Sequence, residues 1–460
     1  MTLTADGAPT FLFEDTLSPA DCKRYIALPF DVPPGTGELR IDFAYDPLHV
    51  EFPQGIGNLL SLGLYDPAGF RGNMHNGSNR NTVEIGPCAA TPGFSAGPLL
   101  PGRWVLEVQT HLVLPGAPLN YRAEIRLAEG SGAVEPARLP SFPWQPPLRR
   151  GPGWFRGDLH THTRHSDGKD TVASLLQTAR AYGLDFVALT DHNTVTALYD
   201  PMLQGYRDLL VIPGMELTTY YGHALALGTT RWFDWRTGSR RRTMGQALEE
   251  IHAAGGLSVL AHLAALGDPA CTGCAWLYTD QMPGIVNAME VWNGPWFEVG
   301  TNSPNTLHIY YEWLSRGHRL PATAGTDTHG PEQYARCPAF NVVYATELSA
   351  PAILSGVRAG HVMLSTGPRV YLEAALSNGE IAIMGDVVAA QEVRQLTLRT
   401  PEAPAGARVR WVVEGEPAAE WSASEEVFSP SCPDGARWAL AELRAADGAM
   451  LALTNPIYLK

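Results

Sequence analysis

Apolar and polar positions alternate in short runs over residues 10–129, as in GELRIDFAYD and RWVLEVQTHLVL, with glycine and proline between the runs. A period of two places apolar side chains on one face of a strand. Short strands at this spacing predict an all-β domain, specifically a β-sandwich. The stretch VEPARLPSFPWQPPLRRGPGW follows, and its many prolines predict an extended linker and a boundary near residue 150.

The period changes in the middle of the chain, where apolar strand candidates alternate with amphipathic helices. Three segments have helical spacing with a cap at the start and glycine at the end: TVASLLQTARAYG, TMGQALEEIHAAG and SAPAILSGVRAG. The strand candidates are DFVALT, LLVIPG, HALALG, LSVLAH, IVNAMEV and LPATAGT. Alternating strands and helices predict an α/β region with a mostly parallel sheet, closed or open.

Alternating runs return after STGPRVY, as in RQLTLRT and ARVRWVVEG, and they predict a second small β-domain. The sequence therefore predicts three domains. Residues 1–148 form the β-sandwich, residues 149–368 the α/β region, and residues 369–460 the C-terminal β-domain.

Composition and charge narrow the class of protein. Hydrophobic residues make up 45% of the 460 residues and charged residues 17%, as in globular proteins. The net charge of −14 argues against general binding to nucleic acid or to anionic membranes. No apolar run reaches the roughly 18 residues of a membrane span, and the start MTLTADGAPTFLFED lacks the pattern of a secretory signal. We therefore expect a cytoplasmic protein.

The cysteines and one basic segment carry weaker signals. Six cysteines in so long a chain do not indicate a disulfide framework. For Cys271 and Cys274 in CTGC we predict two reduced loop cysteines, with a local disulfide as the next alternative and a zinc site only weakly indicated. The segment RTGSRRRT, residues 236–243, is interpreted as a solvated loop ahead of a helix.

Ionisable residues gather where the strand candidates of the middle region end. In β/α folds the loops that follow the strands carry the chemistry. Of the 14 histidines, six fall at or beside these positions, together with three carboxylates. The nine side chains are His160, His162, Asp167, His192, Glu216, His223, His262, Asp327 and His329.

The spacing and chemistry of these residues favour metal binding. In HTH, His160 and His162 lie two residues apart on an extended strand, so both project from one face, and Asp327 and His329 repeat this spacing in DTH. Nine nitrogen and oxygen donors exceed the needs of one ion, so we predict two or three divalent ions. Such donors suit Zn, Mn or Fe, and the lack of thiolates argues against a structural zinc site.

The motifs DLHTHT, SDG, LTDHN, GMELTT, AHLA and GTDTHG resemble those of the PHP superfamily, the polymerase and histidinol phosphatase metal hydrolases. The similarity is strong over residues 157–330. The segments GFRGNMHNGSNR and GVRAGHVMLSTGP are similar to those of CehA/McbA-type metallohydrolases, which extends the resemblance over most of the chain. The resemblance implies a distorted (β/α)7 barrel in the middle region.

The resemblance also implies a ligand scheme. His160, His162 and Asp327 hold a first ion; Glu216 bridges to a second, which His223 and His262 complete; Asp167, His192 and His329 hold a third. Asp158 and Asp191 are candidates to orient neighbouring imidazoles. One departure is AHLA, where the family often has His-Pro; it changes the loop but removes no donor.

This scheme implies a multinuclear metal-dependent hydrolase acting through metal-activated hydroxide. The first hypothesis is a phosphoesterase, for monoesters or diesters. The second is hydrolysis of carbamates or carboxylic esters at the same site, and the third is a binding protein with an inert barrel. We expect a small-molecule ester as substrate, with nucleotide-like esters among the candidates and self-association of the chain left open.

Candidate catalytic residues are Glu216, Asp327, His329 and Arg336. Arg336 is interpreted either as a phosphate contact or as a member of a surface ion pair. Candidate substrate contacts are Arg164, His165, Tyr220, Tyr221, Trp292 and Trp296, with Phe297 beside them. Packing within the barrel and between domains is an equally good interpretation of the aromatic residues.

Overall fold

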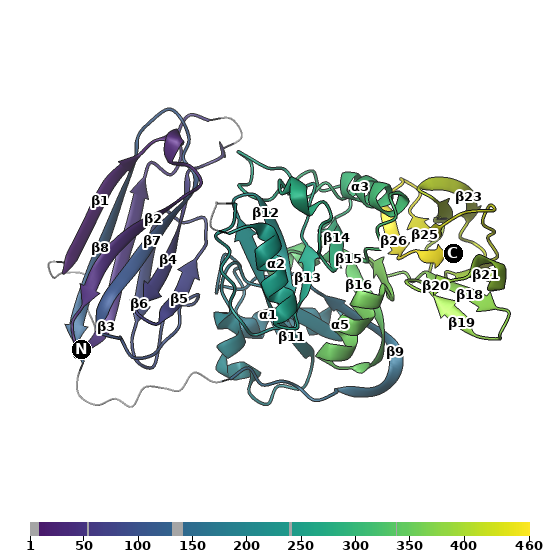
Figure 1. Ribbon diagram of the computed structural model, residues 1–460, viewed down its shortest axis with the longest axis horizontal. Coiled ribbons are helices and arrows are strands. Elements are labelled where there is room, and N and C mark those ends of the chain that lie inside the picture. Colours follow the sequence, from purple (N-terminus) through teal and green to yellow (C-terminus); the bar gives the residue numbers. More distant parts are fainter. Residues whose placement is uncertain (1–8, 53–54, 131–140, 239–241, 337) are drawn as a thin grey trace.

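The computed structural model describes residues 9–52, 55–130, 141–238, 242–336 and 338–460. Three regions follow one another along the longest axis of the molecule (Figure 1). The N-terminal region has its own hydrophobic cluster, whereas the clusters of the middle and C-terminal regions share residues across their boundary. The largest cluster belongs to the middle region, where helices cover the strands. Among the described residues, the helices are too short and too polar to cross a lipid bilayer.

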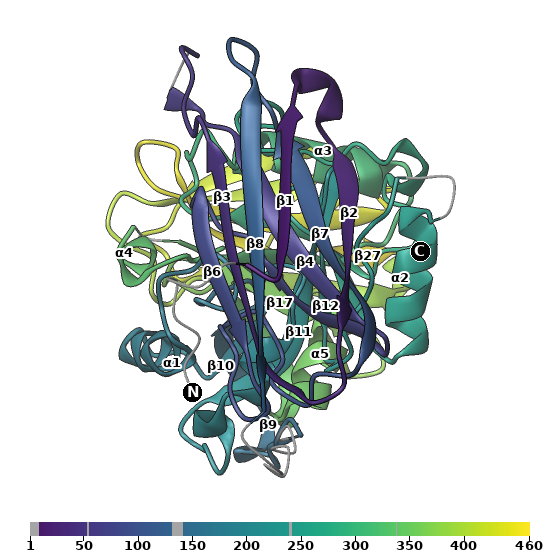
Figure 2. The ribbon, with the colours of Figure 1, turned by 90° about the vertical axis from the view of Figure 1, so that its left-hand side faces the viewer.

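The N-terminal region consists of two four-stranded sheets, ordered β1-β8-β3-β6 and β2-β7-β4-β5. The strands are β1 (Phe11–Leu17), β2 (Arg24–Val32), β3 (Thr36–Asp46), β4 (Leu59–Asp66), β5 (Gly69–Met74), β6 (Arg80–Ile85), β7 (Gly102–Leu112) and β8 (Leu119–Glu129). Alternate residues of β3 are buried, and they share one core with residues of β4 and β7, so the two sheets pack against each other. Seen from this end, the N-terminal sheets cover the middle region (Figure 2).

The middle region is built on a long sheet in the order β15-β14-β13-β12-β11-β10-β9-β16-β17. Its strands are β9 (Arg149–Asp158), β10 (Phe186–Leu189), β11 (Leu210–Thr219), β12 (Gly222–Leu227), β13 (Leu257–Leu260), β14 (Ala288–Asn293), β15 (Ala322–Gly325), β16 (Phe340–Leu348) and β17 (Val362–Ser365). Strands β9, β10 and β11 pair in parallel, as do β13, β14 and β15. β12 runs antiparallel to both of its neighbours, and so does β16, so the sheet is mixed where the sequence predicted a mostly parallel one. The reason is the short turn after β11, which permits only a hairpin.

The helices of this region are α1 (Val172–Ala181), α2 (Met244–Ala253), α3 (Ser303–Ser315), α4 (Pro331–Tyr334) and α5 (Ala350–Ala359). The three predicted helices are present, and Thr171, Thr243 and Ser349 accept a backbone N–H at their starts as predicted. α3 was not predicted; Asn302 at its start lies in the left-handed region and makes no side-chain cap.

Two asparagines connect β15 to the opposite end of the long sheet. The side chain of Asn341, on β16, accepts from Ala324 N at 2.9 Å and donates to Ala324 O at 2.6 Å. Asn455 does the same at Ala322, at 2.7 and 2.9 Å. These amides bond the backbone N–H and C=O groups of the edge strand β15, which would otherwise pair with a neighbouring strand. The sheet therefore curves round on itself at this point.

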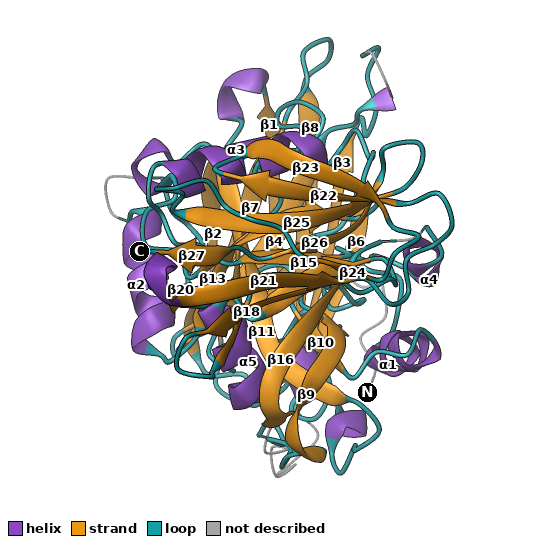
Figure 3. Ribbon diagram, turned by 90° about the vertical axis from the view of Figure 1, so that its right-hand side faces the viewer, coloured by secondary structure: helices purple, strands orange, loops and turns teal. Residues whose placement is uncertain are grey.

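The C-terminal region continues the long sheet through the pairing of β17 with β26, followed by β25, β22 and β23 (Figure 3). A separate sheet has the order β19-β18-β21-β24. The strands are β18 (Tyr371–Leu376), β19 (Ile381–Ile383), β20 (Val387–Val388), β21 (Val393–Arg399), β22 (Arg408–Val413), β23 (Glu416–Ser422), β24 (Val427–Phe428), β25 (Trp438–Arg444), β26 (Met450–Thr454) and β27 (Ile457–Leu459). The backbone pairing therefore crosses the predicted boundary at residue 368.

Three local predictions are corrected or limited. Cys271 and Cys274 form a disulfide, so the prediction of reduced cysteines is wrong; a turn with Gly273 at φ +85° brings their Cα atoms to 5.5 Å. Of the predicted linker, residues 131–140 lie outside the described residues, residues 141–148 have no regular structure, and β9 begins at Arg149. In the basic segment, residues 239–241 also lie outside the description, and Arg236 is half-buried against Asp234 and Glu107 and is not freely solvated.

Candidate metal centre

The predicted ligands come from five consecutive neighbours in the long sheet and from β15. His160 and His162 follow the end of β9, His192 follows β10, and Asp327 and His329 follow β15. Glu216 lies within β11, and His223 lies on β12, where it pairs with Thr218, two residues after Glu216. Backbone bridges join Thr161 to Thr328 and His192 to Glu216, which holds the loops together. Residues far apart in sequence therefore meet at one edge of the sheet.

Three overlapping groups of side chains have ligand atoms within 4.8 Å of one another. The groups are His162, Asp167, His192 and His329; His160, His162 and Asp327; and His160, Glu216 and His262. They include eight of the nine predicted ligands. The ninth, His223, places its Nδ1 3.2 Å from Glu216 Oε1.

Glu216 lies at the centre of the site and is fully buried. Its Oε2 is 2.8 Å from His192 Nδ1 and 3.4 Å from His160 Nε2. Its Oε1 is 3.3 Å from His262 Nε2 and equally faces His223. One carboxylate thus faces imidazoles on both of its oxygens, which is the arrangement a bridging ligand needs.

Asp327 faces the first histidine pair. Its Oδ1 is 2.9 Å from His162 Nε2 and 3.3 Å from His160 Nε2. Asp327 has φ +52° and His262 has φ +25°, conformations that side-chain-bearing residues rarely adopt. Such backbone is retained where the surroundings over-determine it, and it clusters at functional sites.

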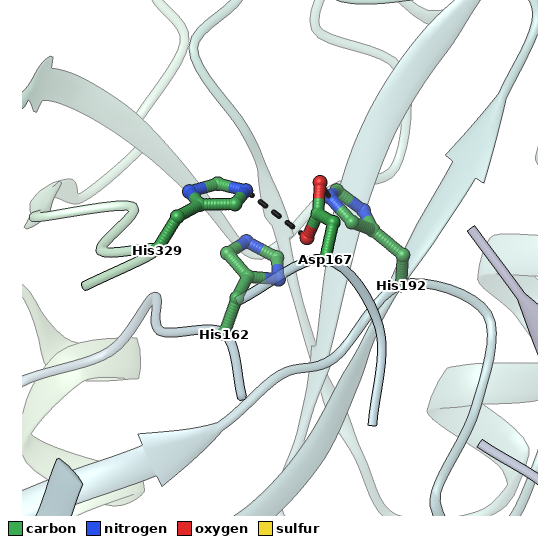
Figure 4. A group of neighbouring side chains, drawn as sticks. All are labelled: His162, Asp167, His192 and His329. Carbon is green, nitrogen blue, oxygen red and sulfur yellow. Dashed lines mark ion pairs between the residues drawn. The ribbon is translucent and has the colours of Figure 1, made fainter. Parts of the chain in front are cut away.

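The third group surrounds Asp167 (Figure 4). Its Oδ1 is 3.1 Å from His329 Nε2 and its Oδ2 is 3.4 Å from His192 Nε2. The ring of His162 lies next to both other imidazoles, with centroids 4.2 Å from His192 and 4.4 Å from His329, and the centroids of those two rings are 6.0 Å apart. Three imidazoles and one carboxylate therefore converge on a small volume.

Buried polar atoms without hydrogen bonds test whether a metal fits. Among the described residues, several such atoms belong to the predicted ligands: His160 Nε2, His162 Nδ1, Asp167 Oδ1, Glu216 Oε2, and both ring nitrogens of His223. A buried polar atom without a partner costs free energy, so native proteins rarely retain one. A divalent cation is the partner that imidazole nitrogens and carboxylate oxygens share. The residues present therefore fit metal ions.

Charge interactions in the site are strong. Burial disfavours the charged form of Glu216, but His160, His192 and His223 outweigh it and hold the pKa of this carboxyl well below its usual range. Burial also opposes protonation of His329, yet Asp167 raises its pKa to about 9. Burial, with His192 nearby, lowers the pKa of His162 to about 4.

Three ligand imidazoles are oriented through their other nitrogen, as metal-binding histidines require. His160 Nδ1 is 2.8 Å from Glu290 Oε2, His262 Nδ1 is 3.2 Å from Cys274 O, and His329 Nδ1 is 2.7 Å from Asp327 O. Glu290 was missed by the sequence analysis. A single carboxylate inside the apolar strand candidate IVNAMEV was the available signal, because buried charges occur only with partners.

The carboxylates expected to orient imidazoles act on the loops instead. Asp158 accepts from Thr326 Oγ1 at 2.6 Å, from Tyr334 OH at 3.0 Å and from His160 N at 3.2 Å. Asp191 accepts from Thr163 N and Oγ1 at 2.8 Å each, and from Ser166 Oγ at 2.7 Å. They fix the backbone that carries the ligands.

A cavity of about 530 Å³ opens on the ligands. Asp167, His192, His223, His262, Asp327 and His329 line one side. The other side is formed by the loop 269–274 and by the N-terminal region, whose residues are Leu48, His49, Ile56, Gly57, Asn58, Leu59, His75, Asn76, Gly77 and Leu112. The sequence analysis named none of these N-terminal residues as site residues, because no pattern within the N-terminal strands indicates which face meets the middle region.

The predicted substrate contacts lie elsewhere, and none of them lines this cavity. Tyr220 and Trp292 are buried, and Tyr220 OH donates to Arg24 O at 2.9 Å. The ring of Trp296 packs 5.0 Å from that of Trp292.

The remaining predicted contacts are as follows. Tyr221 is half-buried below Lys23, Phe297 is 62% exposed, and Arg164 is exposed. His165 Nδ1 lies 2.9 Å from Thr196 Oγ1. Arg336, a candidate catalytic residue, pairs with Glu298.

Comparisons with known proteins give one family match. Residues 158–247 match the PHP domain family. No curated protein is significantly similar to this chain.

Three solved structures show weak similarity. A two-domain protein of Bacteroides vulgatus, containing a domain predicted to be a PHP-like metal-dependent phosphoesterase, is 17% identical, with 71% of this chain and 100% of that one covered and a TM-score of 0.38. An amidohydrolase of Chromobacterium violaceum with bound sulfate and no metal is 18% identical, with 38% and 88% covered and a TM-score of 0.28. A Bifidobacterium adolescentis protein, provisionally assigned as a metal-dependent phosphoesterase, is 17% identical, with 44% and 94% covered and a TM-score of 0.29.

These TM-scores are too low to support an argument about this chain. The family match covers six of the predicted ligands, and the other three, His262, Asp327 and His329, meet them in space. Together, the family match and the ligand groups support a metal-dependent hydrolase. The chain is similar to the PHP domain family over residues 158–247.

Proposed function

We propose that this protein is a multinuclear metal-dependent phosphoesterase. The observation that carries the proposal is the buried Glu216, which has five imidazoles within 3.5 Å while its Oε2 lacks a hydrogen bond. A carboxylate and imidazoles placed this way can all bind a cation. Without a cation, several of their buried polar atoms have no hydrogen-bond partner. An inert scaffold would have no reason to keep all nine donors.

The predicted ligands would hold three ions. His160, His162 and Asp327 would hold one ion, Glu216 with His223 and His262 a second, and Asp167 with His192 and His329 a third. Divalent Zn, Mn or Fe, when bound, would activate water and neutralise charge on the substrate. Glu290 and the carbonyl of Cys274 keep the Nε2 atoms of His160 and His262 turned inward. Asp158 and Asp191 hold the loops in place, so little reorganisation is needed when substrate binds.

The side chains that line the cavity limit the class of ester that could bind. Among the described residues that line it, none is lysine or arginine. Phosphate dianions are usually bound by such cations, so a substrate here relies on metal ions for its charge. A phosphodiester, with one negative charge, fits this lining better than a monoester with two.

A second candidate reaction is hydrolysis of a carbamate or carboxylic ester. The apolar part of the lining, formed by Leu48, Ile56, Leu59 and Leu112, favours it, because a neutral ester needs no cationic side chain. Both reactions would use the same ligands, so the geometry of the metal centre does not separate them.

The test is turnover by protein reconstituted with Mn or Zn. Bis(p-nitrophenyl) phosphate, p-nitrophenyl phosphate and 1-naphthyl carbamate are offered side by side, with chelator-treated protein as the control. We expect metal-dependent turnover with the diester fastest. Turnover of the carbamate alone would replace the phosphoesterase by the second candidate, and no turnover of any ester would overturn the proposal.

A further inference from the structure

We propose that His75, supplied by the N-terminal region, is a substrate-contacting residue of the metal centre and donates a hydrogen bond from its Nε2 to an oxygen of the bound ester. The inference rests on the proposed hydrolase function. It makes the N-terminal sheets part of the active site. The match to the PHP domain family begins at residue 158, so it does not include His75.

The position of His75 places it beside the ligands. It follows the end of β5 and lines the cavity together with Asp167, His192 and His329. Its ring centroid is 4.9 Å from that of His192, with the rings inclined at 63°. A molecule bound to the ions in this cavity therefore has His75 as a neighbour.

The ring of His75 is held in a defined orientation. Ser61 on β4 is 2% exposed, and its Oγ lies 3.0 Å from His75 Nδ1, the one hydrogen bond recorded for this hydroxyl. In the tautomer that the proposal requires, the Ser61 hydroxyl donates to Nδ1 and the ring proton is on Nε2. On its other side the ring packs edge-on against His111, with centroids 4.7 Å apart. These contacts leave Nε2 as the free nitrogen.

Other polar residues of the same wall are already engaged. Asn58 donates to Pro47 O and accepts from Leu114 N, at 2.7 Å each. Asn76 donates to Asn81 Oδ1 at 3.0 Å and accepts from Ser78 N at 3.1 Å. His49 is exposed at the rim. Among the described residues of this wall, His75 is therefore the half-buried side chain with a ring nitrogen available to a substrate.

A neutral donor facing the ions has a chemical consequence. It can bond a phosphoryl or carbonyl oxygen without adding charge to the wall. An ester is then held between cations on one side and an uncharged N–H on the other. Orientation of this kind lowers the entropic cost of reaching the reactive arrangement.

The experiment compares His75→Ala, His75→Gln and Ser61→Ala with the wild type, using the full-length, metal-loaded protein. His318→Ala serves as the control, because His318 is exposed beyond the end of α3. Metal content, thermal unfolding, kcat and KM with bis(p-nitrophenyl) phosphate, and dimethyl phosphate binding by calorimetry are measured for each.

We expect His75→Ala to lower kcat/KM and to weaken dimethyl phosphate binding by about 3- to 10-fold, the loss of one neutral hydrogen bond. Metal content and unfolding temperature should match the wild type. Ser61→Ala should lower kcat/KM by about 2- to 3-fold, since the ring then turns more freely. His75→Gln, which keeps an N–H donor, should restore kcat/KM to within about twofold, and a purely packing role would not give that rescue.

Two outcomes would overturn the inference. One is a His75→Ala variant with unchanged kcat/KM and unchanged dimethyl phosphate binding; the other is loss of metal from His75→Ala and His75→Gln alike, which would make the residue structural. If the wild type hydrolyses none of the esters, the hydrolase proposal fails. Calorimetry then decides on His75 alone, supporting the contact if dimethyl phosphate binds more weakly to His75→Ala and refuting it if binding is equal.

Discussion

The two walls of the cavity are built on different physical principles. The wall at the strand ends of the middle region concentrates carboxylates and imidazoles that leave several buried polar atoms unpartnered. The wall from the N-terminal region is uncharged, and its asparagines bond within their own sheets. In the first wall, several buried polar atoms need a cation as their partner. In the second wall, the asparagines are hydrogen-bonded without a cation, and His75 has one ring nitrogen left for a substrate.

This difference separates two tasks. Groups that hold ions must be numerous and held in fixed positions, so they lie on a rigid sheet edge. Groups that select a substrate need shape and a few directed polar atoms, which a sheet from a separate part of the chain supplies. Substitutions in the first wall should therefore remove metal and activity together, and those in the second should change activity while the metal stays bound.

The largest effect is expected for Glu216→Ala. Removing the carboxylate that faces five imidazoles should release both ions that it would bridge and lower kcat by at least about 1,000-fold. Metal content by elemental analysis and turnover of bis(p-nitrophenyl) phosphate measure the two effects. Glu249→Ala, on the exposed side of α2, is the control. A Glu216→Ala protein with full metal content would contradict the bridging role.

A second, smaller effect is expected where the two walls meet. Gly273 has φ +85°, and a Cβ there would lie 1.9 Å from Thr219 O and 3.1 Å from His223 Nε2. Its neighbour Thr272 donates to His111 O of β7 at 3.2 Å. Gly273→Ala should lower the free energy of unfolding by about 3 kcal/mol or more, through left-handed strain plus overpacking. It should also reduce metal affinity through His223.

The matched control for this substitution is Gly183→Ala. Gly183 has φ +69°, but a Cβ there meets nothing within 4 Å, so only the conformational term of about 1 kcal/mol remains. Chemical denaturation measures both free energies. Equal losses at the two positions would mean that the loop 269–274 yields easily and does not set the position of His223.

The ligand wall could be predicted from sequence because its chemistry is local in the chain. HTH, DHN and DTH each place donors directly after an apolar strand, and strand ends of one sheet meet in space. The helices with Thr or Ser caps and a final glycine were predictable for the same reason. The hairpin β11–β12 was not, since HALALG has the same apolar pattern as a parallel strand.

The wall from the N-terminal region could not be predicted, because its residues line the cavity only once the N-terminal sheets pack against the middle region. His75 stands in a polar run, GNMHNGSN, that reads as a turn, and its relation to His192 depends on how two sheets pack against a third. Likewise, aromatic residues close to the ligands in sequence, such as Tyr220 and Trp292, point into cores and not into the cavity. A position near a strand end in the sequence was therefore a better guide to the groups that meet in the metal centre than to the residues that line the cavity.

A third prediction concerns a contact between the walls that lies away from the cavity. His165 Nδ1 bonds Thr196 Oγ1 at 2.9 Å and faces the backbone N–H of Gly93 at 3.4 Å. His165→Ala should lower the free energy of unfolding by about 1 kcal/mol, the value of one hydrogen bond, while metal content stays complete. Elemental analysis and denaturation check this. A missing third ion would place His165 or its loop among the ligands, against the assignment of Asp167.

The smallest effect is expected for Arg336→Ala, which separates the two interpretations of this arginine. Its guanidinium is half-exposed and pairs with Glu298, and it does not line the cavity. Exposed ion pairs contribute about 0–1 kcal/mol, so stability should hardly change and kcat/KM for bis(p-nitrophenyl) phosphate should stay within about twofold. Arg316→Ala, which removes another exposed arginine that pairs with a glutamate, is the control. A loss of 100-fold or more in Arg336→Ala alone would instead mean that the arginine swings to the phosphate when substrate binds. The uncharged lining would then describe only the free enzyme, and the preference for a singly charged ester would no longer follow from it.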